Sequence, residues 1–139
     1  MTDWQPTASL EAIKARAELL STVRAFFAAR NVLEVDTPQL ARHGVSDPHI
    51  QCIPVPGHGY LQSSPVYHMK RLLAADSGPI FQLAKSFRDG EVGARHNIEF
   101  TMLEWYASYW NFQDNMDFTE VLIKKTLADV TGGLHLAFA

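Results

Sequence analysis

A run of alternating side chains constrains the fold of this chain more than any other feature. From Ile98 to Tyr106, successive side chains are expected to alternate between two faces with the period of a β-strand. Before it, Ile80, Leu83 and Phe87 indicate a strand that ends at Arg88, and a polar loop, residues 89–97, separates the two. Strands joined by such a loop pair antiparallel. The sequence therefore predicts a hairpin whose second strand carries two faces: Phe100, Met102, Glu104 and Tyr106 on one, and Thr101, Leu103 and Trp105 on the other.

The sequence predicts two helices before this hairpin and one after it. Apolar residues recur at three- and four-residue steps over Leu10–Arg30, which predicts an amphipathic helix with Ser9 as its N-cap. A second helix is expected to about Ala75, with Ser64 as cap and Pro65 at its first position. A third is expected over about Gln113–Val130, ended by glycines 132 and 133. Its apolar stripe comprises Met116, Val121, Leu122, Leu127 and Val130.

The remaining segments are expected to form short strands and loops. Val32–Val35 and Tyr60–Gln62 are expected as short strands, and Pro38 stops the first. Residues 41–59, rich in Gly, Pro, His and Asp, are expected to form a loop with at most one short strand near Ile50–Val55. Together these elements predict an α+β domain with a mostly antiparallel sheet and flanking helices.

The composition excludes a disordered or membrane-spanning protein and disfavours a nucleic-acid-binding one. The chain has 139 residues, of which 47% are hydrophobic and 19% charged, so it can bury a core and is not disordered. No apolar run approaches the roughly 20 residues that cross a bilayer, and a net charge of −3 disfavours extensive phosphate contacts with nucleic acid. The single cysteine, Cys52, cannot form an internal disulfide. We expect a cytoplasmic protein without membrane contacts.

The predicted hairpin also carries chemistry. Arg88, at the end of its first strand, suits a phosphate. Phe100 offers a ring on which a base can stack, and Glu104 with Tyr106 can bind an ammonium group. These residues predict a site for a nucleotide beside a cationic small molecule. The alternative is a half-buried strand with no site, in which Arg88 forms a surface ion pair with Asp89 or Glu91.

Three segments resemble the class II aminoacyl-tRNA synthetases of the lysine type. Phe87–Glu91, Arg95–Asn97 and Glu99–Tyr106 together are similar to their second signature motif. The helix Leu10–Arg30 with the strand that ends at Pro38 resembles the first motif, and Ser64–Leu73 resembles the substrate-loop helix. Trp4–Pro6 and Tyr67–Leu73 are most similar to the paralogous branch that ligates (R)-β-lysine to elongation factor P and lacks an anticodon-binding domain.

The resemblance implies an adenylate-forming ligase. Lysine or β-lysine would be activated by ATP as an aminoacyl-adenylate and passed to elongation factor P. Arg88 would be the catalytic residue, holding the α-phosphate of ATP. The expected ATP-binding residues are Arg88, Asp89, His96, Asn97 and Phe100, and the expected amino-acid-binding residues are Ser64, Pro65, Val66, Glu104 and Tyr106. Mg²⁺ is expected to accompany ATP, with no ligands in this chain, and the first motif implies a homodimer.

The chain also departs from the family pattern. Val66 and Gly90 stand where glutamates are usual, and Ile98 replaces a frequent proline. The glycine-rich third motif with its second arginine is not found, so residues 1–139 are interpreted as one partial, truncated catalytic domain that carries motifs 1 and 2.

Two alternatives to this ligase remain open. One is a non-catalytic paralogue that keeps a dimer or binding role. The other is a lysyl-tRNA synthetase fragment, although Trp4 stands too close to the first motif for an upstream tRNA-binding domain.

Overall fold

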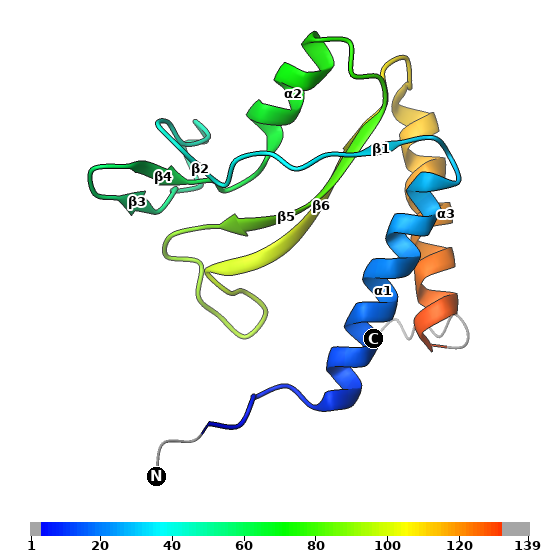
Figure 1. Cartoon of the computed structure of the whole chain (residues 1–139), viewed down its shortest axis with the longest axis horizontal. Helices are drawn as coiled ribbons and strands as arrows, with labels where there is room; N and C mark the ends of the chain where they lie inside the picture. Colours follow the sequence, from blue (N-terminus) through cyan, green and yellow to red (C-terminus); the bar gives the residue numbers. More distant parts are fainter. Residues whose placement is uncertain (1–3, 132–139) are drawn as a thin grey trace. The chain divides into compact units, whose positions relative to one another are not determined.

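The computed structural model of the chain describes residues 4–131, which fall into two compact units (Figure 1). Unit 1 combines the segment that ends at Arg30 with the segment that begins at Tyr109, and unit 2 is formed by Asn31–Ser108. Unit 1 contains two long helices, and unit 2 contains all the strands and a short helix. The α+β composition predicted from the sequence is confirmed.

Unit 1 is built on helices α1, Leu10–Ala28, and α3, Phe112–Thr131. Ser9 caps α1 as predicted, because its side chain accepts a hydrogen bond of 3.1 Å from the Ala12 N–H. Helix α3 begins with a reciprocal cap. The Asp114 N–H donates to Asn111 Oδ1 at 3.0 Å, and the Asn111 N–H donates to Asp114 Oδ2 at 2.9 Å.

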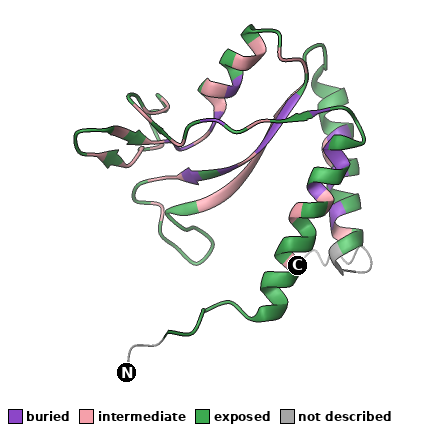
Figure 2. Cartoon of the chain, viewed as in Figure 1, coloured by how far each residue is buried: buried purple, intermediate pink, exposed green. Residues whose placement is uncertain are grey.

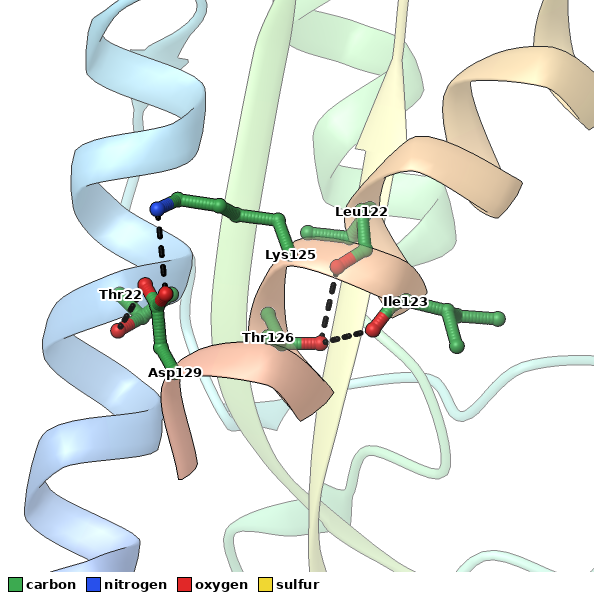
Figure 3. Close-up of polar contacts among 6 residues, drawn as sticks. All are labelled: Thr22, Leu122, Ile123, Lys125, Thr126 and Asp129. Carbon is green, nitrogen blue, oxygen red and sulfur yellow. Dashed lines mark hydrogen bonds and ion pairs between the residues drawn. The ribbon is translucent and has the colours of Figure 1, made fainter. Parts of the chain in front are cut away.

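Aromatic rings form the core of unit 1. Phe26 meets Phe27 and Phe118 edge to face, with centroids 5.7 and 5.1 Å apart, and Val23 and Leu122 are buried with them. Beside this core, Asp129 Oδ2 accepts a hydrogen bond from the Thr22 hydroxyl at 3.4 Å, and Lys125 pairs with Asp129 Oδ1 at 3.2 Å (Figure 3). Side chains from both helices therefore meet here.

The prediction of which residues form the buried apolar stripe of α3 is partly wrong. Leu122 is buried, but Met116 and Val121 are exposed, and Phe118 and Thr126 are buried instead. Thr126 fits the buried face because its hydroxyl donates to the Leu122 carbonyl at 2.9 Å. The side chain of Val130 and the expected stop at glycines 132 and 133 lie outside the described residues.

Unit 2 contains the predicted hairpin. Strands β5, Ile80–Phe87, and β6, Glu99–Tyr106, pair antiparallel in a register that runs from Ile80 opposite Tyr106 to Phe87 opposite Glu99. Strand β1, Leu33–Glu34, pairs parallel to β5, which gives the order β1-β5-β6. The central strand β5 is the most buried of the three (Figure 2).

A second small sheet has the order β2-β4-β3, from Leu40–Ala41, Gly59–Leu61 and Pro54–Val55. The expected short strand near Ile50–Val55 is confirmed as β3, and the strand expected at Tyr60–Gln62 is β4, shifted by one residue. Strand β2 was not expected, because two residues are too few to show an alternation. All pairs in this sheet are antiparallel.

Gly59 opens β4 with a backbone φ of +128°. A Cβ atom added there would lie 2.2 Å from the Ala41 carbonyl oxygen. Both the dihedral angle and the close approach of β2 therefore require glycine at this position.

Helix α2 spans Val66–Ala74 and begins one residue later than predicted, so Pro65 takes the cap position. Ser64 still satisfies a free donor of the first turn, because the Val66 N–H donates to Ser64 Oγ at 3.1 Å. The buried apolar residues of unit 2 are Val32, Met69, Ile80, Phe81 and Ala84. Among residues 4–131, no helix is long and apolar enough to cross a membrane.

Candidate functional site

The register of β5 and β6 brings the predicted site residues to one face of the hairpin. Residues directly opposite each other in an antiparallel pair project to the same side. Phe100 lies opposite Ser86 and Glu104 opposite Gln82. Arg88 continues the same alternation just beyond β5, and its N–H donates to the Ile98 carbonyl at 2.9 Å. The expectation that Phe100, Met102, Glu104 and Tyr106 share a face is confirmed.

A carboxylate held by two hydroxyls forms the first cluster on this face. Ser64 Oγ donates to Glu104 Oε2 at 2.7 Å, and the Tyr106 hydroxyl donates to Glu104 Oε1 at 2.7 Å. All three side chains are half-buried. Each oxygen of Glu104 keeps lone pairs for a further donor. The cluster therefore presents an oriented carboxylate to a cation.

The environment of Tyr106 keeps its hydroxyl protonated. Burial raises the pKa of Tyr106, and both the hydrogen bond to Glu104 and the negative charge of that carboxylate raise it further. Tyr106 is thus a hydrogen-bond donor to Glu104.

A guanidinium group and a ring form the second cluster. The Arg88 guanidinium lies 5.0 Å from the centroid of the Phe100 ring, in a cation–π contact. Arg88 also lies 3.7 Å from Glu91 Oε1, and its side chain is 23% exposed. The ion pair considered as an alternative for Arg88 is therefore present, with Glu91 as the partner. It coexists with the contact to Phe100.

Two buried polar atoms next to this cluster have no hydrogen-bond partner among residues 4–131: Ser86 Oγ and Arg88 Nε. Ser86 is fully buried. Gln82, also buried, accepts a hydrogen bond from the Thr37 hydroxyl at 2.9 Å. Ser86 and Gln82 are not among the predicted site residues, although both share the alternation phase that places them on the same face as Arg88.

The remaining predicted site residues lie at the edges of these clusters. Asp89, His96 and Asn97 are exposed in the loop between the strands, and in the described part of the chain no hydrogen bond or ion pair joins them to Arg88 or Phe100. His96 pairs through its backbone with Gly93. Pro65 is buried, and Val66 contributes its backbone N–H to Ser64. The structure thus groups Ser64, Glu104 and Tyr106, and separately Arg88 and Phe100.

No three His, Cys, Asp or Glu side chains converge as metal ligands within residues 4–131. The two clusters are separated along β6 by the four-residue step from Phe100 to Glu104, about 13 Å of extended strand. Met102 and Ala84 lie opposite each other between them. The face can therefore hold an elongated ligand with an aromatic and anionic end and a cationic end.

Comparison with known proteins identifies the family of the chain. Residues 1–137 match the family described as tRNA synthetases class II (D, K and N). The chain belongs to this family. Its α+β fold is accordingly of the class II synthetase type.

Curated relatives of the chain include several proteins named elongation factor P–(R)-β-lysine ligase. The protein from Photobacterium profundum is 46% identical over 133 residues, which is 89% of this chain and 41% of the relative. The protein from Edwardsiella ictaluri is 46% identical over 138 residues, 91% of this chain and 42% of the relative. The protein from Pseudoalteromonas translucida is 54% identical over 112 residues, 74% of this chain and 35% of the relative. The chain spans about two fifths of the length of the first two relatives.

Proposed function

We propose that this chain supplies the ATP- and amino-acid-binding face of an enzyme that activates lysine or β-lysine and transfers it to elongation factor P. The names of the relatives support this reaction, since these proteins are called elongation factor P–(R)-β-lysine ligases. One observation carries the proposal: Arg88, Phe100 and Glu104 project from the same face of one hairpin.

In the proposed reaction, a carboxylate oxygen of the amino acid attacks the α-phosphorus of ATP. The bond from this phosphorus to the bridging oxygen breaks, and pyrophosphate leaves. A lysine amine of elongation factor P then attacks the activated carbonyl carbon, AMP departs with the electron pair of the broken bond, and the amine loses a proton. The acceptor lysine and both products follow from the family resemblance.

The side chains have distinct roles in this scheme. Arg88 would bind the α-phosphate and stabilise the negative charge that develops in the transition state. Phe100 would stack on adenine, with Asp89, His96 and Asn97 contacting the nucleotide from the loop. Glu104, oriented by Ser64 and Tyr106, would bind the side-chain ammonium of the substrate. Pro65 and Val66 would border the amino acid. Mg²⁺ would come with ATP, and we assign it no ligand among the described residues.

A homodimer is also part of the proposal. Helix α1 leaves Leu10 74% exposed and Ile13 46% exposed. Apolar residues that gather on one helix favour association with a second protein surface. Light scattering coupled to gel filtration should give twice the monomer mass, whereas a clean monomer would contradict the dimer.

The activity is tested by ATP–pyrophosphate exchange with lysine and with β-lysine. We expect exchange by the native chain and its loss in Arg88→Ala. Lys85→Gln is a matched control, because Lys85 lies on the opposite face of β5 and pairs with Glu99 at 2.6 Å. Equal exchange by the native chain and Arg88→Ala would refute the assigned role of Arg88.

A second candidate is a non-catalytic member of the family that binds ligands without turnover. Val66 and Gly90 favour it, because each replaces a carboxylate usual in the resembling family. Calorimetry separates the two candidates. ATP binding without exchange would support this second candidate, and binding with exchange would support the ligase.

A further inference from the structure

A cavity of about 420 Å³ in unit 2 is lined by none of the residues of the proposed site. One wall comes from the end of β2 and the residues after it, including Arg42 and His43. The other wall comes from helix α2, through Tyr67, His68 and Arg71. The volume falls within the roughly 300–1,000 Å³ that is typical of small-molecule sites.

The charge of this cavity is opposite to that of the whole chain. The net charge of the protein is −3, yet the lining contains two arginines, two histidines and no Asp or Glu. Within residues 4–131, neither Arg42 nor Arg71 forms a side-chain hydrogen bond or an ion pair. Two guanidinium groups from different elements thus border one cavity with their donors available.

Hydrogen bonds hold both walls of this cavity in place. The buried Gln62 donates through Nε2 to the carbonyls of His43 and Tyr60, each at 3.0 Å. The Tyr67 hydroxyl lies 2.5 Å from Ser46 Oγ, which ties helix α2 to the loop after β2. Because these contacts hold the backbone at both walls, a ligand would not have to order them on binding.

We propose that this cavity binds a small polyanion, a ligand with two or more phosphate or carboxylate groups. Guanidinium groups bind both kinds of oxyanion through paired hydrogen bonds, and the two arginines come from separate walls, so a ligand with two anionic groups can engage both. The imidazoles of His43 and His68 add hydrogen-bond donors. This site shares no residue with the ATP- and amino-acid-binding face, and it does not depend on the proposed ligase activity.

The test is calorimetry of the intact chain with pyrophosphate and, separately, with citrate, at physiological ionic strength. The two titrations distinguish a phosphate from a carboxylate preference. Arg42→Gln and Arg71→Gln should each weaken binding roughly tenfold or more, the loss expected for a charge-assisted hydrogen bond. Arg71→Lys, which keeps the charge but not the planar fork, should give an intermediate loss.

Two controls make the result specific. Lys70→Gln removes the same charge from the adjacent position of α2 but does not line the cavity, and binding should stay within about twofold of the native value. Because pyrophosphate can also occupy the proposed nucleotide site, both titrations are repeated in Arg88→Ala, where binding to the cavity should persist. Circular dichroism checks that each variant is folded. The proposal is overturned if neither anion binds, if Lys70→Gln weakens binding as much as Arg71→Gln, or if Arg88→Ala abolishes it, which would assign the anion to the nucleotide site.

Discussion

Tyr106 donates a hydrogen bond of 2.7 Å to Glu104, two residues earlier on the same strand and the same face of the sheet. Ser64, from the turn before helix α2, donates to the other carboxylate oxygen at the same distance. The carboxylate is therefore fixed by one neighbour in its own strand and by one that is distant in sequence. This arrangement leads to the first two predictions.

The free energy of unfolding should depend on Tyr106 at high pH. Because the pKa of Tyr106 is raised in the folded protein, the unfolded chain releases this proton first, above the ordinary tyrosine pKa of about 10. The stabilising contribution is complete below that pH and is lost as pH rises further. Urea unfolding as a function of pH should show a steeper decline for the native chain than for Tyr106→Phe. Identical slopes would contradict the raised pKa.

Removing the charge of Glu104 should impair binding of a substrate ammonium. Glu104→Gln is expected to weaken lysine or β-lysine binding by roughly tenfold or more, since a charge-assisted hydrogen bond is lost. Glu99→Gln is the control, because Glu99 is an exposed carboxylate on the opposite face of the same strand. Calorimetry measures both, and equal losses in the two variants would argue for a nonspecific charge effect.

The unpaired hydroxyl of Ser86 should contribute nothing to stability. A buried donor without a partner costs about 1–3 kcal/mol, so Ser86→Ala should be neutral or stabilising by up to about 1 kcal/mol. Thr37→Val is the contrasting change, because it removes the donor to Gln82 and should destabilise by about 1–3 kcal/mol. Urea denaturation gives both values. A strongly destabilised Ser86→Ala would mean that this hydroxyl has a partner in solution.

Gly59 should tolerate alanine far less well than Gly57. Both have positive φ, +128° and +77°. A Cβ atom added at Gly59 would meet the Ala41 carbonyl, whereas one added at Gly57 would have no non-neighbouring atom within 4 Å. Gly57→Ala should cost about 1 kcal/mol from backbone strain, and Gly59→Ala should cost more, about 2–4 kcal/mol. Thermal denaturation of the two variants tests this order, and equal losses would exclude the steric contribution of β2.

Local patterns were enough to predict much of this fold. The alternation from Ile98 to Tyr106 gave the face that carries Phe100 and Glu104, and Ser9 marked the start of α1, because both signals arise from neighbours in sequence. Strand β2 was missed, since a two-residue strand is defined only by its distant partner β4. On α3, spacing alone could not tell which side of the helix packs on Phe26 and Phe27.

In the candidate site too, contacts between sequence neighbours could be predicted and contacts between distant residues could not. Arg88 and Phe100 could be grouped from the sequence, because they belong to one hairpin. The hydrogen bond from Ser64 to Glu104 joins residues 40 positions apart and could be inferred only through a family resemblance. The partnerless hydroxyl of Ser86 depends on what surrounds it in three dimensions, so no sequence pattern could reveal it.

The pairing of Ser86 with Phe100 and of Gln82 with Glu104 belongs to one continuous ladder. If β6 slipped by one residue against β5, the ring and the carboxylate would turn together to the opposite side, and Thr101 and Leu103 would replace them. The ring proposed to stack on a base and the carboxylate proposed to bind an ammonium group would therefore be displaced together by such a slip. Either side chain can be substituted alone, but a change of register moves both to the other face.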